Sequence, residues 1–217
     1  MYQPDQFKVD DPAEMHALMR ARPFATLISA GSLGLYATQL PTVLKTASDA
    51  GAGGEHGVID CHLARANPHW KDLASGAEAL MIFQGAEGYI RPAWYPSKGQ
   101  HGKVVPTWNY ETVHVYGRPV VAEDPVWLER HVTELTDQQE AGQHAPWTTS
   151  DAPAAFIQTL LRGIVGFRFV ITRLEGKRKM SQNREIGDRR GVVAGLRARG
   201  ASEDAAMADM VPGKLDE

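Results

Sequence analysis

This sequence has little cysteine, no excess of positive charge and no apparent secretory signal. It has a single cysteine, Cys61, which excludes an internal disulfide and any zinc site built from several cysteines. Lys and Arg total 23 against 26 Asp and Glu, so charge alone does not predict a surface made for nucleic acid. The chain opens without a basic stretch and a following apolar run, so no secretory signal is predicted. These absences favour a reducing, cytoplasmic location.

Long apolar runs are also scarce. Residues 23–44 lack charge and are long enough to cross a membrane, but they include two prolines, two glycines and several hydroxyl side chains. This composition predicts two strands, at 24–28 and 35–44, joined by a turn at 31–34. We therefore expect no membrane span.

The remaining pattern predicts a fold that is mainly β with peripheral helices (α+β). Further strands are expected at 58–63, 79–83, 88–94, 113–122 and 164–175, with a turn at Gly85 and a polar loop at 96–102. The last two alternate: Val113, Val115 and Gly117 lie opposite His114 and Tyr116, and Val165, Phe167, Phe169 and Ile171 share one face. Helices are expected to start at three Asx-proline pairs: from Asp11-Pro12 to before Pro23, from Asn67-Pro68 to Gly76, and from Asp124-Pro125 onward. In the first, Met15, Leu18 and Met19 recur at helical spacing, and further helices are expected at 153–162, 188–199 and 202–210. This order lacks regular βαβ alternation and favours a small, mostly antiparallel barrel. We expect one domain, 1–217, in which 186–217 is a C-terminal helical extension.

Three segments could carry chemistry. The first is HLARANPHW (62–70), where a strand meets a capped helix and Arg65 could hold a phosphate, unless Arg65 is only a solvated surface residue. The second is an aromatic cluster that suits a planar ring ligand, a core or a subunit interface. Its members are Tyr89, Trp94, Tyr95, Trp108, Tyr110 and Tyr116.

The third segment is GKRKMSQNR (176–184), with four cations and three amide or hydroxyl side chains. It predicts binding of an anion, either a small-molecule phosphate or a nucleic-acid backbone, with a solvated turn as the alternative. Residues 177–199 hold eight Lys and Arg against two acids, so the rest of the chain carries nine net negative charges.

Other kinds of site are disfavoured. His62, His69 and His114 have no carboxylate or second cysteine at metal-ligand spacing, so no metal is expected. Cys61 and His62 point to opposite faces of a strand and cannot form a nucleophile and base, which makes Cys61 a buried, inert thiol. The glycine-rich residues 51–54 lack the strand and helix of a dinucleotide loop.

Taken together, the motifs resemble the PaiB-type family of FMN-binding negative transcriptional regulators. The resemblance rests on residues 1–4, 62–70, 83–85, 89–95, 105–110, 113–117, 164–167 and 179–184. It implies a split β-barrel related to pyridoxamine-phosphate oxidases and flavin reductases, a homodimer, and FMN bound between subunits. The loop at 50–56 is longer and richer in glycine than the resemblance leads us to expect.

The resemblance also assigns cofactor-binding residues. Those for the FMN phosphate or ribityl chain are His62, Arg65, Asn67 and Lys71. Those flanking the flavin ring or the dimer seam are Trp94, Tyr95, Trp108, Asn109 and Tyr110. Those closing the pocket, from the same or the partner subunit, are Lys179, Ser181, Gln182 and Asn183.

The implied function is flavin-dependent negative regulation of sporulation and degradative-enzyme genes. The alternative is a flavin-dependent oxidoreductase or flavin reductase with no direct DNA binding, and a third possibility is a flavin-free scaffold. No residue is identified as catalytic. The two C-terminal helices superficially resemble a helix-turn-helix, but the second carries Glu203, Asp204 and Asp209 without a cation, the wrong sign for a DNA groove.

Overall fold

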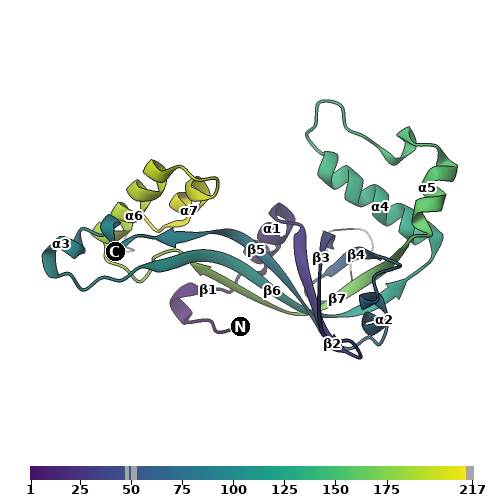
Figure 1. Cartoon of the computed structure of the whole chain (residues 1–217), viewed down its shortest axis with the longest axis horizontal. Coiled ribbons are helices and arrows are strands. Elements are labelled where there is room, and N and C mark those ends of the chain that lie inside the picture. The colour runs from purple at the N-terminus through teal and green to yellow at the C-terminus, as the bar shows by residue number, and fades with distance from the viewer. Residues whose placement is uncertain (47–48, 50–52, 214–217) are drawn as a thin grey trace. The chain divides into compact units, whose positions relative to one another are not determined.

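The computed structural model describes residues 1–46, 49 and 53–213, and Figure 1 labels its elements. The loop at 50–56 falls in part, at 50–52, outside the described residues. The strands are β1 (Lys8–Val9), β2 (Phe24–Gly31), β3 (Gly34–Lys45), β4 (Val58–Ala64), β5 (Ala79–Ile90), β6 (Thr107–Ala122) and β7 (Ile164–Lys179). The helices are α1 (Pro12–Ala21), α2 (His69–Leu73), α3 (Ser97–His101), α4 (Pro125–Glu140), α5 (Ala154–Leu161), α6 (Ile186–Arg199) and α7 (Asp204–Met210). Three 3-10 turns complete the list: η1 (Asp5–Phe7), η2 (Pro92–Trp94) and η3 (Thr149–Asp151).

The chain forms two compact units. The barrel unit comprises Pro12–Phe83 and His114–Leu174, and the terminal unit comprises Met1–Asp11, Gln84–Val113 and Glu175–Glu217. Each of the long strands β5, β6 and β7 contributes residues to both units.

The sheet is a ring of strands. Its order is β1-β7-β4-β3-β2-β5-β6, and a further pairing of β7 with β6 closes the circle. Strand β2 pairs antiparallel with β3 and β5, and β4 pairs antiparallel with β3 and β7. The strands thus close into an antiparallel ring with helices at its periphery, which confirms the predicted barrel. Closure also pairs strands that would otherwise be exposed edges of the sheet.

Alternate residues of the strands fill the barrel. On β7, Val165, Phe167, Phe169 and Ile171 are buried, which confirms the predicted inward face. On β6, Val115 and the flanking odd-numbered residues are buried while His114 and Tyr116 are half-buried, again as predicted. Fully burying one such Phe contributes about 2 to 3 kcal/mol of hydrophobic free energy. Cys61 is completely buried on β4, and burial raises the pKa of its thiol, so the prediction of an inert cysteine is confirmed.

Most predicted helices are confirmed. Asp124 caps α4, since its carboxylate accepts hydrogen bonds from the backbone N–H groups of Val126 and Trp127 and Pro125 occupies the first turn. Helix α1 buries Met15, Leu18 and Met19, the residues that set its predicted spacing. Helices α6 and α7 lie at the predicted C-terminal positions, separated by Gly200 in the left-handed conformation at a φ of 65°.

Three predictions about local structure are wrong. Residues 79–90 form one strand, β5, with no turn at Gly85. Buried positions are odd-numbered up to Gly85 and even-numbered from Ala86 onward, so the strand changes its buried face there. The predicted polar loop at 96–102 contains the short helix α3.

The third wrong prediction is the length of two strands. Strand β6 begins six residues earlier than predicted, at Thr107, and β7 continues through the basic residues to Lys179. Pairing with β1, in which Lys8 lies opposite Lys177, extends β7 beyond the apolar alternation that guided the prediction.

Candidate functional site

The strand-to-helix corner after β4 is built around Asn67. Its Oδ1 accepts a hydrogen bond from the backbone N–H of His69 at 3.0 Å, and its Nδ2 donates to Thr38 Oγ1 at 3.2 Å. Asn67 therefore starts α2 and ties it to β3. Because α2 has only five residues, its dipole adds little to anion binding.

Arg65, the predicted phosphate ligand, is held by groups of the protein itself. Its Nε donates to the carbonyl of Arg162 at 3.1 Å, its Nη2 to the carbonyl of Ile164 at 3.0 Å, and its Nη1 to Glu123 at 2.7 Å. Glu123 also balances the positive charge of Arg65. Lys71, at the same corner, is also exposed.

His62 contacts a second histidine on α4. Its Nδ1 lies 3.0 Å from His131 Nε2, and the indole of Trp127 stacks on the His131 ring. Burial, followed by the neighbouring His62, lowers the pKa of His131 to about 3, and burial lowers the pKa of His62. The two rings are therefore a neutral pair at physiological pH, in which one N–H donates to the other ring's nitrogen. His62 also lines a pocket of about 250 Å³ whose other lining residues come from α4, α5, their connection and the start of β7.

His69 is completely buried between two hydroxyl groups. Its Nε2 lies 2.9 Å from Ser29 Oγ and its Nδ1 lies 2.9 Å from Thr38 Oγ1. Burial lowers its pKa, so the neutral ring bridges β2 and β3 to α2. Asp72 of α2 likewise binds the β2–β3 turn through the backbone N–H groups of Ser32 and Leu33.

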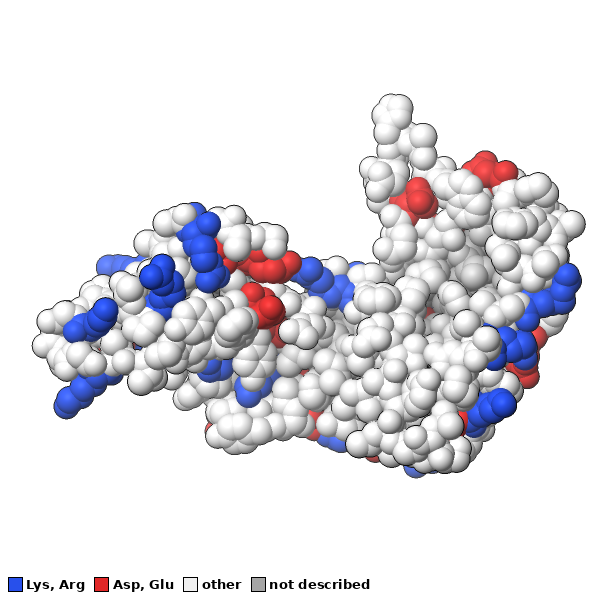
Figure 2. Space-filling view, viewed as in Figure 1, with Lys and Arg blue, Asp and Glu red and all other residues white. Residues whose placement is uncertain are grey.

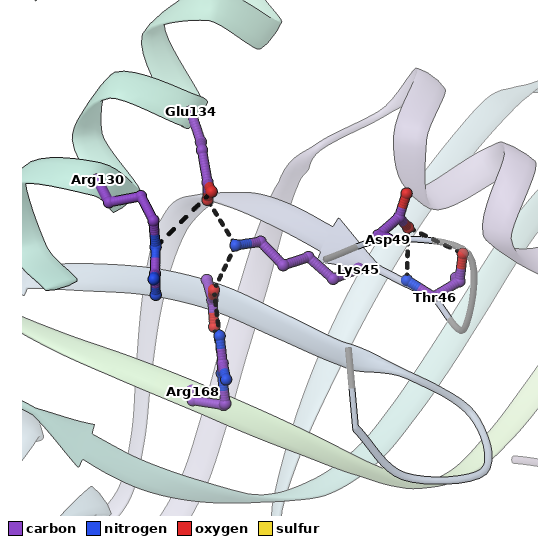
Figure 3. A network of polar contacts seen from close by, with 7 residues as sticks. Lys45, Thr46, Asp49, Arg130, Glu134 and Arg168 are labelled. Carbon is purple, nitrogen blue, oxygen red and sulfur yellow. Dashed lines mark hydrogen bonds and ion pairs between the residues drawn. The ribbon is translucent and has the colours of Figure 1, made fainter. Parts of the chain in front are cut away.

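A network of buried charges lies beneath α4 (Figure 3). The ammonium of Lys45 bridges Asp60 at 3.1 Å and Glu134 at 2.6 Å, and Arg168 binds Asp60 from the other side. Burial alone would raise the pKa of Asp60, but Arg168 and Lys45 outweigh burial and hold it below its ordinary value. The network joins β3, β4 and β7 to α4.

In the terminal unit, the predicted pocket-closing residues lie against the start of β6. Asn109 and Ser181 are buried and hydrogen-bonded to each other, Nδ2 to Oγ at 3.0 Å. Ser181 adopts a left-handed conformation at a φ of 65°, unusual for a residue with a side chain. The side chain of Gln182 binds the backbone of two preceding residues, accepting from Met180 N–H and donating to the carbonyl of Arg178.

Lys179 has an unusual environment for a cation. Its ammonium donates to Thr107 Oγ1 and to the carbonyl of Trp108, both neutral oxygens. Burial, together with the charges of Lys177 and Arg184, lowers its pKa. Among the described residues, Lys179 makes no ion pair. This half-buried positive charge is therefore not compensated by a carboxylate.

The aromatic residues serve different purposes. The backbone and indole of Trp94 pack on α6, where a Cβ at Gly191 would lie 1.9 Å from the Trp94 carbonyl oxygen and one at Gly195 would lie 2.2 Å from the indole. Tyr95 is buried in the same cluster beneath the Arg184 guanidinium. In contrast, Trp108 is 48% exposed and packs against Tyr89.

The thirteen predicted cofactor residues thus divide into two groups. His62, Arg65, Asn67 and Lys71 belong to the barrel unit, and the other nine belong to the terminal unit. Tyr110 lies 5.4 Å from the Lys177 ammonium, and Asn183 is exposed. Sequence reasoning did not identify Lys45, Asp60 or the polar role of His131, because no motif marks a contact between residues so far apart in the chain.

The barrel, its peripheral helices and these motifs define a split-barrel protein of the PaiB type. The chain belongs to the family described as "Putative FMN-binding domain", whose model matches residues 1–173. It is 31% identical to the uncharacterized protein AN0679 of Emericella nidulans, over 91% of this chain and 90% of that protein. It is 29% identical to "Protease synthase and sporulation protein PAI 2" of Bacillus subtilis, over 99% of this chain and 98% of that protein.

Solved structures confirm the fold alone, because their sequences are distant. The FAD and heme binding protein of Mycobacterium smegmatis superposes with a TM-score of 0.57 at 16% identity, covering 79% of this chain and 73% of that one. The flavocytochrome Anf3 of Azotobacter vinelandii gives 0.55 at 13% identity, covering 80% and 69%. Within the described residues, no helix has the length and apolar character needed to cross a membrane.

Proposed function

We propose that this protein binds FMN and acts as a flavin-dependent regulator. The observation that carries the flavin proposal is the uncompensated ammonium of Lys179, held by Thr107 Oγ1 and by the backbone carbonyl of Trp108, a residue whose side chain is exposed. A phosphate needs a cation, and a flavin ring packs on an aromatic surface, so these residues fit FMN. Membership of the "Putative FMN-binding domain" family supports FMN, and the FAD-binding protein and the flavocytochrome among the solved structures support a flavin more generally.

Each group of predicted residues would make its own contribution. Lys179 would hold the phosphate or another anionic oxygen, while Trp108 and Tyr110 would shield one face of the ring from water. In the barrel unit, Lys71 is the exposed cation predicted for the FMN phosphate or ribityl chain. When bound, a flavin supplies hydride and electron transfer, and the protein's part is to position it and to tune its potential.

Flavin titration tests this proposal. Adding FMN to the purified protein should quench flavin fluorescence and shift its visible spectrum. Lys179→Gln should weaken FMN binding about ten-fold while affecting riboflavin less, because only FMN carries the phosphate. Lys71→Gln tests the barrel unit in the same way, and Lys98→Gln, at an exposed lysine of α3, is the control. An unchanged flavin spectrum at saturating FMN would refute the proposal.

The regulatory role is supported by the relative PAI 2, whose name refers to protease synthesis and sporulation. The second candidate, a flavin reductase or oxidoreductase that does not bind DNA, is favoured by the C-terminal helices. Arg199 and Arg197 of α6 pair with Asp204 and Asp209 of α7, so these four charges are largely neutralised within the helix pair. Gel retardation with genomic fragments at physiological salt, together with NAD(P)H-dependent flavin reduction, separates the two. Reduction without any retardation would refute direct repression.

We also propose a homodimer formed through the outer face of β2, β3 and β5. Leu35 on this face is 83% exposed and pairs with Ala30, and Ile28 pairs with both Ala37 and Leu80. An uncovered apolar sheet face of this kind is typical of a subunit interface. A second copy of the chain presents the same face, as a two-fold dimer requires.

A further inference from the structure

A groove of about 420 Å³ lies on α6 in the terminal unit, outside residues 1–173 that match the family model. It is lined by three arginines of α6, by Val193 and Ala194 of the same helix, and by Pro212 and Gly213. Figure 2 shows that Lys and Arg side chains gather over this part of the surface. Its size falls within the range of small-molecule sites.

The most informative residue in the groove is Arg189. Its side chain is only 6% exposed, its Nη1 donates to the carbonyl of Pro212 at 3.3 Å, and its Nε has no hydrogen-bond partner. Among the described residues, no carboxylate pairs with it. Keeping a buried guanidinium without a counter-ion costs free energy, and this cost is recovered when an anion binds.

The other arginines increase the positive potential. Arg190 is exposed and makes no ion pair within the described part of the chain. Arg197 pairs with Asp209 at 3.3 Å, an exposed contact that solvent screens. The groove therefore carries more positive than negative charge.

The remainder of the lining is apolar. The side chains of Val193, Ala194 and Pro212 consist only of carbon, and the arginine stems add their methylene groups. Nucleic-acid backbones bind to exposed cations spread over a broad surface. This groove instead combines a buried guanidinium with apolar lining residues. A guanidinium fork matches a carboxylate with two parallel hydrogen bonds.

We propose that this groove binds a small organic acid, with its carboxylate on Arg189 and Arg190 and its apolar body on Val193, Ala194 and Pro212. Such a site goes beyond the flavin function and is separate from it. Occupation would compensate the buried charge of Arg189 and hold the segment after α7 against α6, since Arg189 already binds the Pro212 carbonyl.

Calorimetric titration of the full chain with octanoate, octanol and octylamine tests the chemistry of the ligand. The three probes share one apolar body and differ in the head group. Octanoate should bind at least about ten-fold more tightly than octanol, and octylamine should not bind. Equal binding of octanoate and octanol, or no binding of octanoate, would overturn the proposal.

Substitutions test the place of binding. Ala194→Phe fills the groove from an exposed position and should abolish octanoate binding, whereas Ala198→Phe, exposed on the same helix but outside the lining, should leave it unchanged. Arg190→Gln should weaken it about three- to ten-fold. Equal affinity in Ala194→Phe and the unsubstituted protein would place binding elsewhere.

Arg189→Met separates a binding role from a structural one. Replacing an uncompensated buried charge by an apolar side chain should leave the melting temperature unchanged or raise it, while octanoate binding is lost. Retained octanoate affinity in this variant would contradict the proposal, and Ala194→Phe decides the question if the variant does not fold.

Competition identifies the occupant. Displacement of octanoate by FMN would assign the acid to the flavin site and overturn a separate groove. Retardation of a DNA duplex that Arg190→Gln abolishes, and that octanoate does not inhibit, would assign the arginines to nucleic acid instead.

Discussion

Arg168 donates two parallel hydrogen bonds to Asp60, from Nε to Oδ1 at 2.9 Å and from Nη2 to Oδ2 at 3.0 Å. Asp60 is 1% exposed, and Lys45 contacts its second oxygen at 3.1 Å. The carboxylate of Asp60 on β4 therefore pairs with two cations, one on each of the strands that flank β4. Glu134 extends the network to α4.

Removal of this carboxylate's charge should destabilise the barrel unit strongly. We expect Asp60→Asn to lower the free energy of unfolding by about 3 kcal/mol, because Arg168 would lose its ion pair and Lys45 would keep only Glu134. Urea denaturation measures the change. Glu123→Gln, which breaks the exposed pair with Arg65, should cost less than about 1 kcal/mol, and equal effects would contradict this explanation.

The His62–His131 pair predicts a pH dependence of stability. The pKa of His131 is about 3 in the folded chain against an ordinary value of 6.5, so the unfolded state binds more protons between these values. Stability is therefore fully present above about pH 6.5 and falls as the pH drops toward 3, by at most about 1.4 kcal/mol per pH unit for this histidine.

His131→Phe provides the comparison for this pH dependence. The variant should show a shallower decline in unfolding free energy over the same pH range, because one titrating group is gone. Parallel curves for the variant and the unsubstituted protein would rule out His131 as the cause.

Two glycines of α6 should respond in opposite directions to the same substitution. Gly191→Ala would place a methyl group against the backbone of Trp94 and should cost about 2 kcal/mol. Gly187→Ala meets no atom within 4 Å and should stabilise the helix by about 0.5 kcal/mol, because alanine loses less entropy on folding. Thermal unfolding of both variants measures the difference.

Leu35→Glu should dissociate the proposed dimer. Because Leu35 is 83% exposed, the substitution costs little folding free energy in the monomer but buries a charge in the interface. Light scattering after size exclusion should show a halved mass, whereas Val126→Glu, at a 73% exposed residue of α4, should not change it. A monomeric unsubstituted protein would refute the interface.

Local rules predicted much of the fold. The three Asx-proline pairs correctly located the starts of α1, α2 and α4, and period-2 alternation identified the inner faces of β6 and β7. These features depend on neighbouring residues in the chain. The turn expected at Gly85 was wrong because glycine also permits a strand to change its buried face.

The candidate site was less predictable. The HLARANPHW motif located the corner after β4, but the sequence does not show that Arg65 is engaged by the carbonyls of Arg162 and Ile164, almost a hundred residues away. Similarly, the motif marked Trp94 as a candidate for the flavin ring, whereas its indole packs against a glycine of α6. Such pairings depend on tertiary contacts that spacing along the chain does not encode.

The three strands shared by the two units restrict how this protein can be divided. The chain passes between units within β5, β6 and β7, and the matched family segment ends at residue 173, inside β7. The terminal unit is assembled from three separate stretches of chain, so no single gene segment encodes it. Transplanting the whole terminal unit into another protein would therefore require three grafts, and a gene fusion that copied residues 1–173 would leave β7 incomplete and without its pairing to β1.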